Sequence, residues 1–249
     1  MYKNKLCLLS MLFMTTSVLA DVQDEVVKSF NVGERAEFRI ENINGEVEIT
    51  AWDKNEIKVT AMITADNQEE RERIIIDMDA NARGVSVETR YKKSGWGNNN
   101  SGSVDYRVQV PVNTRLTSVD LVNGSLSIEG VRGEMNVDLV NGSITATGLA
   151  SDSEINSVNG SIDVTYESIS SELREISIDT VNGRIELNVP ENINAEVDIE
   201  TMHGSIRNDF GLSSDKNMFS GRHLNGTIGS GDISISIESV NGGVRLQKR

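Results

Sequence analysis

The sequence predicts an all-β protein: a parallel β-solenoid of short Asn-Gly-cornered coils with an N-terminal β-layer cap. Two observations carry this prediction. The phrase DLVNGS begins at Asp120 and again at Asp138, and related Asn-Gly phrases recur at intervals of roughly twenty residues, as in solenoid repeats. Apolar residues alternate with polar ones on both sides of each pair, which is the period of a strand with one buried face.

Each repeated pair marks an expected corner between two strands. The corners are Asn44-Gly45, Asn123-Gly124, Asn141-Gly142, Asn159-Gly160, Asn182-Gly183, His203-Gly204, Asn225-Gly226 and Asn241-Gly242. Equivalent residues of stacked coils lie about 4.8 Å apart, so we expect the asparagine side chains to hydrogen-bond along a ladder. His203 occupies the asparagine position of its coil. A metal site of His203 with His223 is the alternative, but a side chain that tolerates an unusual φ is the simpler interpretation.

An array of β-hairpins is the competing fold, because Asn-Gly between alternating runs is a strong hairpin signal. In a two-residue hairpin, the residue before Asn shares a face with the residue after Gly. Here an aliphatic residue precedes the pair and a polar residue usually follows it, as with Val140 and Ser143. We therefore expect a solenoid corner that turns the aliphatic side chain inward. The aliphatic positions are Ile43, Val122, Val140, Val158, Val181, Met202, Leu224 and Val240.

The chain divides into three expected parts. Residues 1–20 have Lys3 and Lys5 before an apolar run that ends at Ala20, the pattern of a cleaved signal peptide. Residues 21–112 form an N-terminal β-rich cap region with one short charged helix over 68–73, and residues 113–249 form the solenoid repeats. We expect a periplasmic protein without a transmembrane anchor after cleavage; the cell surface and secretion are the alternatives.

The composition limits which partners and which reactions the sequence supports. The chain has 38 acidic and 24 basic side chains, so nucleic acid is an unfavourable partner. Its single cysteine, Cys7, lies in the predicted signal peptide, which leaves no disulfide or thiol chemistry in the mature chain. No phosphate-binding glycine loop or catalytic triad is present, and we expect no cofactor and no enzyme activity.

Two sets of residues remain as candidate sites. Acidic residues lie four positions before corner glycines and should form a row on the outer face, either solvated or binding cations weakly: Asp120, Asp138, Asp179, Glu200 and Glu238. Trp96, in the Gly/Asn/Ser-rich stretch 92–103, is the candidate anchor for a partner, together with Tyr91 and Tyr106.

Longer segments carry a resemblance. FRIENINGEVEITAWDKNEIKV from Phe38, VDYRVQVPVNTRL ending at Leu116, LNVPENINAEVDIETMHGSI from Leu187 and the serial Asn-Gly-Ser-Ile phrases resemble the bacterial family of exported β-solenoids called "putative adhesins", a domain family of unknown function. The resemblance implies a non-enzymatic, adhesin-like interaction or scaffolding module of the cell envelope, whose partner is an envelope protein or glycan. End-to-end association of copies is also compatible with it. The alternatives are a polysaccharide lyase-like enzyme that uses the acidic row and an envelope-sensing module that binds through the Trp96 loop.

Overall fold

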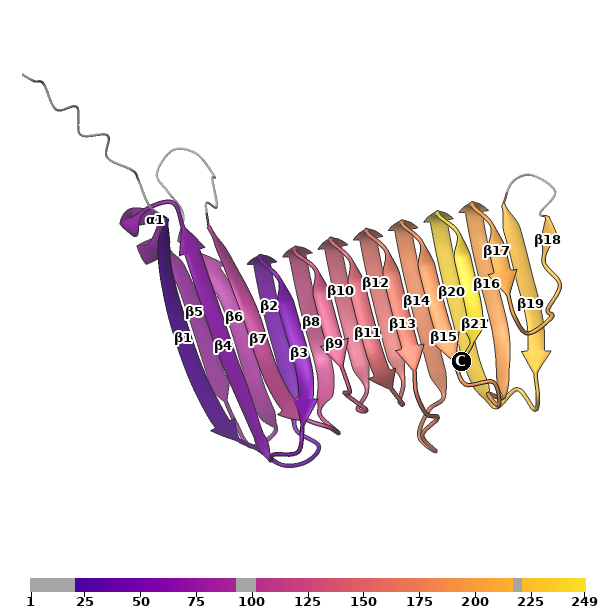
Figure 1. The fold of residues 1–249 in the computed structure, drawn as a ribbon, viewed down its shortest axis with the longest axis horizontal. Coiled ribbons are helices and arrows are strands. Elements are labelled where there is room, and N and C mark those ends of the chain that lie inside the picture. Colours follow the sequence, from indigo (N-terminus) through magenta and orange to yellow (C-terminus); the bar gives the residue numbers. More distant parts are fainter. Residues whose placement is uncertain (1–20, 93–101, 217–220) are drawn as a thin grey trace, which may run out of the picture.

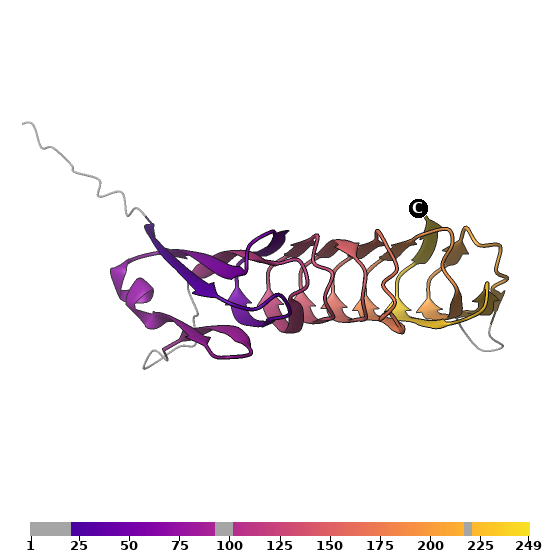
Figure 2. The same cartoon turned by 90° about the horizontal axis from the view of Figure 1, so that it is seen from below.

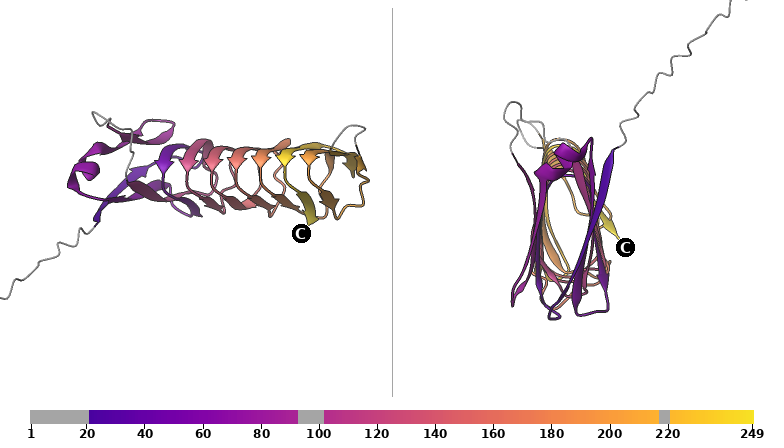
Figure 3. Two further views of the ribbon diagram at one scale, coloured as in Figure 1. Left: turned by 90° about the horizontal axis from the view of Figure 1, so that it is seen from above. Right: turned by 90° about the vertical axis from the view of Figure 1, so that its left-hand side faces the viewer.

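The computed structural model describes residues 21–92, 102–216 and 221–249. It consists of two long β-sheets that pack face to face along the molecule (Figures 1 and 3). The predicted signal peptide and Trp96 lie outside the described residues. In the described part of the chain, no helix has the length and apolar character to cross a membrane.

The first sheet has ten strands. In spatial order they are β1 (Val22–Asn31), β4 (Glu56–Ala65), β7 (Ser103–Pro111), β3 (Val47–Trp52), β9 (Leu126–Glu129), β11 (Ile144–Leu149), β13 (Ile162–Tyr166), β15 (Ile185–Val189), β21 (Val244–Lys248) and β17 (Ile206–Asn208).

The second sheet has eleven strands. In spatial order they are β18 (Asp215–Lys216), β19 (Arg222–Ile228), β16 (Ala195–His203), β20 (Ile233–Asn241), β14 (Glu175–Asn182), β12 (Ser153–Asn159), β10 (Met135–Asn141), β8 (Arg115–Asn123), β2 (Glu37–Asn44), β6 (Gly84–Tyr91) and β5 (Ile74–Ala80).

The central coils form a parallel solenoid, as predicted. Each coil adds one strand to each sheet, and Figure 2 shows the coils stacked one behind another. β10 runs parallel to β12 with Val137 opposite Ile155, and β11 runs parallel to β13 with Ile144 opposite Ile162. A hairpin array would pair the two strands of one coil with each other, so the parallel register excludes it.

The corners stack closely. The side-chain amide of Asn159 donates to Oδ1 of Asn141 at 2.9 Å, and equivalent bonds link Asn44, Asn123, Asn182 and Asn241 in one ladder. Glycine is required beside them, because a Cβ at Gly160 would lie 1.6 Å from the carbonyl oxygen of Gly142.

The stacking order differs from the chain order at the C-terminal end. β20 and β21 lie between the coil of β14 and β15 and the coil of β16 and β17, so Asn241 stands between Asn182 and His203. The chain therefore ends inside a sheet and not at an open edge. Asn225-Gly226 is not a corner, and the prediction there is wrong. It lies within β19, an antiparallel strand in which Asn225 faces Asp198.

The N-terminal region joins the solenoid without a break. β2 and β3 form a coil whose strands run parallel to β8 and β9, so both sheets continue through the expected boundary at residue 112. The antiparallel strands β1, β4 and β5 cover this end. The predicted helix is present as α1 (Gln68–Arg73), capped by Asn67, whose Oδ1 accepts a 3.0 Å hydrogen bond from the backbone N–H of Glu70.

A continuous apolar core fills the space between the sheets. Two buried tyrosines connect the sheets within it. The hydroxyl of Tyr166, on β13, donates to the carbonyl oxygen of Ser151 at 3.0 Å and lies 2.8 Å from Oγ of Ser153, on β12. Tyr106, on β7, lies 2.7 Å from Oγ1 of Thr89, on β6. Burial raises the pKa of both phenols, that of Tyr106 to about 12, so both remain protonated donors at neutral pH.

Candidate binding groove on the eleven-stranded sheet

A groove of about 990 Å³ follows the outer face of the eleven-stranded sheet. It crosses β2, β8, β10, β12, β14, β20 and β16, which are consecutive neighbours in the sheet. Two parallel rows of side chains line it, one aliphatic and one mainly acidic. We call them the aliphatic row and the acidic row.

The aliphatic row consists of the residues that precede the corners. It contains Ile43, Val122, Val140, Val158, Val181, Val240 and Met202 in spatial order. All but the partly buried Ile43 are between 37% and 53% exposed. The expectation that the corner turns these side chains inward is therefore wrong. Strand alternation continues up to the asparagine, so Leu139 points inward and Val140 points outward. Leu224 is buried, because its strand is β19 and has no corner.

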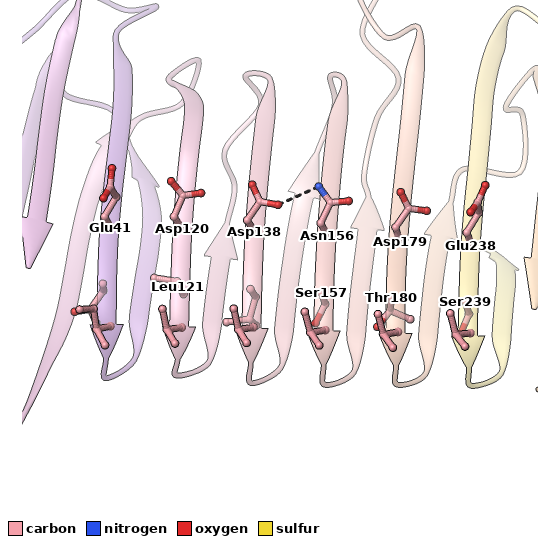
Figure 4. A pocket seen from close by; sticks show the side chains of 18 of the residues that line it. Glu41, Asp120, Leu121, Asp138, Asn156, Ser157, Asp179, Thr180, Glu238 and Ser239 are labelled. Atoms are coloured by element: carbon pink, nitrogen blue, oxygen red, sulfur yellow. Dashed lines mark hydrogen bonds between the residues drawn. The ribbon is translucent and has the colours of Figure 1, made fainter. Parts of the chain in front are cut away.

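The acidic row lies two residues before the aliphatic row on each strand. Figure 4 shows Glu41, Asp120, Asp138, Asn156, Asp179 and Glu238 side by side on successive strands, and Glu200 continues the row on β16. The five acidic residues singled out from the sequence thus share one face. The sequence-based prediction of the row does not include Glu41 and Asn156, although both also lie four positions before a corner glycine.

Hydrogen bonds and burial shape the charge of this row. Nδ2 of Asn156 donates to Oδ1 of Asp138 at 3.1 Å, and Oγ of Ser118 donates to Oδ2 of Asp120 at 2.5 Å. Burial raises the pKa of Asp179, and the charge of Glu154 raises it further, while a backbone hydrogen bond at Glu238 opposes the change. Burial therefore works against the negative charge of Asp179 on this partly desolvated surface.

Cationic side chains line the groove at its ends, Arg90 on β6 and Arg222 on β19, and among the lining residues described none lies between them. Tyr91 is half-buried, lines the same end as Arg90 and donates to the carbonyl oxygen of Gly102 at 3.2 Å. Tyr106 is only 1% exposed, so its ring is not accessible to a partner, contrary to expectation.

Within the described residues, the acidic row provides a compact set of metal-ligand atoms only at Glu200. Glu200 lies with Asp198 and His223, and one ligand atom from each falls within 4.8 Å of the others. His203 is not part of this set.

These features define a class: a two-sheet parallel β-solenoid with an amphipathic groove on one face. The family model Toastrack DUF4097 matches residues 98–247, and the chain belongs to this family, a domain family of unknown function.

One solved structure supports the same fold, and a second has a weaker similarity. The crystal structure of a "putative cell adhesion protein" from Clostridium sporogenes is 14% identical, covers 92% of this chain and 100% of its own, and has a TM-score of 0.56. A "putative adhesin" from Bacteroides fragilis, 14% identical, covers 90% of this chain and 97% of its own with a TM-score of 0.40. No curated protein matches the sequence.

Proposed function

We propose that this protein is a non-enzymatic binding module that holds a basic amphipathic helix of a partner protein in the groove of the eleven-stranded sheet. The aliphatic row carries the proposal. Single exposed apolar side chains are common on protein surfaces, whereas a contiguous apolar strip with a polar border is typical of interaction sites.

The dimensions of the row favour a helix. Adjacent strands lie about 4.8 Å apart, so the seven strands from Ile43 to Met202 span about 29 Å. This is the length of an α-helix of about 19 residues. A helix with apolar residues at i, i+3, i+4 and i+7 presents a straight apolar strip of the same kind, as in other helix-in-groove complexes.

The charge of the groove favours a basic partner. The acidic row runs about 7 Å from the aliphatic row, two residues away along each strand, which places it beneath the flank of a helix seated on the aliphatic row. Lysine or arginine side chains on that flank would neutralise it. A second copy of this chain, with its net charge of −14, would bring another acidic row to the same surface, so repulsion disfavours pairing of copies through this face.

The envelope is the proposed place of action. The signal-peptide pattern of residues 1–20 supports export, with the periplasm as the compartment. An adhesin-like role also agrees with the name of the Clostridium sporogenes protein, whose fold this chain shares. A polysaccharide lyase-like function is less well supported, because such an enzyme needs a basic group beside its acids and the described lining of the central groove offers none.

The test is fluorescence anisotropy with a labelled 19-residue peptide that carries leucines on one face and lysines on its flanks. We expect the protein to bind it, and binding to weaken as salt is raised. Val140→Lys should reduce the affinity at least tenfold, because it places a positive charge in the aliphatic row.

Thr145→Lys is the matched control. Thr145 is exposed on β11 of the same coil, on the opposite sheet, so the variant has the same net charge and an intact groove. Equal loss in both variants, or equal binding of a peptide with glutamates in place of lysines, would contradict the proposal.

A further inference from the structure

At one end of the eleven-stranded sheet, Glu200 of the acidic row lies beside Asp198 and His223, two residues that do not line the groove. β16 and β19 pair in antiparallel orientation with Glu200 opposite His223, and Asp198 lies on the same face of β16. Nδ1 of His223 lies 3.1 Å from Oε1 of Glu200 and 3.4 Å from Oδ1 of Asp198.

These distances suit a tetrahedral metal ion. Zinc binds nitrogen and oxygen ligands at about 2.0–2.2 Å, which holds neighbouring ligand atoms about 3.4 Å apart. The two distances from Nδ1 are close to this value. One imidazole and two carboxylates are zinc ligands, and a water molecule would complete the tetrahedron.

The histidine nitrogen supplies a second, independent observation. Nδ1 of His223 is buried and makes no hydrogen bond of normal geometry within the described part of the chain, although two carboxylates lie beside it. Buried polar atoms are nearly always paired. The side chain as a whole is 32% exposed, and a metal ion bound by Nδ1 together with the two carboxylates would give this nitrogen a partner.

We propose that Asp198, Glu200 and His223 bind one zinc-class divalent ion that fastens β19 to β16. The imidazole favours a transition metal over calcium or magnesium, which prefer oxygen ligands. Among the described residues, the other neighbour of β19 in the sheet is β18, a strand of two residues, so the ion would reinforce this end of the sheet.

The experiment uses the protein freed of metal with EDTA and titrated with zinc by isothermal calorimetry. We expect one ion per chain, and a rise in the thermal midpoint when zinc is added. Cobalt in place of zinc should give the strong visible absorption of a tetrahedral site. His223→Gln should weaken zinc binding at least tenfold and abolish both the cobalt spectrum and the thermal shift, and Asp198→Asn should weaken it in the same direction.

His203→Gln is the matched control, since His203 is exposed at the end of β16, the strand of Asp198 and Glu200, and lies outside the cluster. It should bind zinc like the native protein. Absence of zinc binding in the native chain, or equal binding by His223→Gln, would overturn the inference and leave an ion pair of His223 with its two acids. The peptide assay of the groove uses metal-free protein, so either proposal can fail without the other.

Discussion

The two sheets share one core and yet present different outer faces. On the ten-stranded sheet, the row of Glu48, Ser127, Thr145, Asp163, Glu186 and Arg245 mixes both charges with small polar side chains. The same coils on the eleven-stranded sheet present the aliphatic row and the acidic row. Since both sheets bury their inner faces in the same way, the shared core does not account for the aliphatic row, and this difference between the faces is what motivates the proposed binding.

The charges differ in the same sense. On the ten-stranded sheet, Nε of Arg107 lies 3.6 Å from Oε2 of Glu48, and Nε of Arg184, just before β15, lies 3.9 Å from Oε2 of Glu186. These two acids therefore each have a cationic neighbour, although Glu186 also stands opposite Asp163. In the centre of the groove the charged lining residues are all acidic. Like charges on neighbouring strands destabilise a sheet. The acidic row is therefore a cost to stability that a cationic partner would relieve.

The largest expected effect is at the corners, which serve both sheets equally. Gly160→Ala would place a Cβ 1.6 Å from the Gly142 carbonyl oxygen, so adjacent coils must separate. We expect the free energy of unfolding, measured by urea denaturation, to fall by about 3 kcal/mol or more. Gly33→Ala is the control, since nothing lies within 4 Å of its Cβ position, and it should change stability by less than about 0.5 kcal/mol. A similar small effect for both variants would show that the corner has room.

The next largest effect is at the link between the sheets. Tyr166→Phe removes the hydroxyl that donates to the Ser151 carbonyl and contacts the Ser153 hydroxyl, leaving both buried groups unpaired. We expect a loss of about 1–3 kcal/mol in urea denaturation. Adding Ser153→Ala should restore part of it, because one unpaired group is then gone. An unchanged stability in Tyr166→Phe would mean that water replaces the lost hydroxyl.

Much of this architecture could be predicted from the sequence because it depends on local rules. The alternation of apolar and polar residues predicts the strands, and the Asn-Gly pairs predict the corners. The 18-residue spacing from Asn123 to Asn141 and from Asn141 to Asn159 predicts the asparagine ladder. The acidic row followed from the same register. The outward direction of Val140 also follows from the sequence, since Val140 lies two residues after Asp138 and strand alternation puts both on one face. The comparison with a hairpin predicts the inward direction, and that prediction is wrong.

The order of the coils depends on interactions that are not local. Judged by its sequence, the coil that contains Asn241 fits beside the coil of Asn182 as well as the coil that contains His203 does. The spacing of the repeats along the chain does not distinguish these two stacking orders. In the structure β19 runs back antiparallel to β16, which lets β20 enter between β16 and β14. Glu200 lies opposite His223 because β19 pairs with β16 in antiparallel orientation, and no short-range sequence pattern predicts this pairing.

A smaller effect on stability, with a clear effect on binding, is expected in the aliphatic row. Val140→Thr with Val158→Thr keeps the β-branched shape but makes the exposed positions polar. We expect less than about 1 kcal/mol change in the free energy of unfolding for the pair. Binding of the leucine-lysine peptide, measured by anisotropy, should weaken about tenfold. A large destabilisation would instead show that these valines are needed for stability, and the difference between the two faces would then no longer support a binding site.

The smallest effect concerns one carboxylate on each face. Burial raises the pKa of both Asp179 and Asp163, with Glu154 and Glu186 respectively adding to the rise. An acid whose pKa is higher in the folded state binds protons more readily there, so its contribution to stability falls as pH rises through that pKa. Asp179→Asn and Asp163→Asn should therefore each stabilise the protein slightly at pH 7, by less than about 1 kcal/mol, and the gain should shrink as the pH is lowered towards the raised pKa.

The two substitutions should differ in their effect on peptide binding, and this difference is the most direct comparison of the two sheet faces. Asp179 lines the groove and Asp163 lies on β13 of the opposite sheet. Each change removes one negative charge, so any effect of net charge on peptide binding is the same in both. Only Asp179→Asn should weaken the leucine-lysine peptide beyond that common effect, because only this carboxylate lies beneath the basic flank of a bound helix. Equal anisotropy curves for the two variants would show that overall charge, and not the acidic row, attracts the peptide.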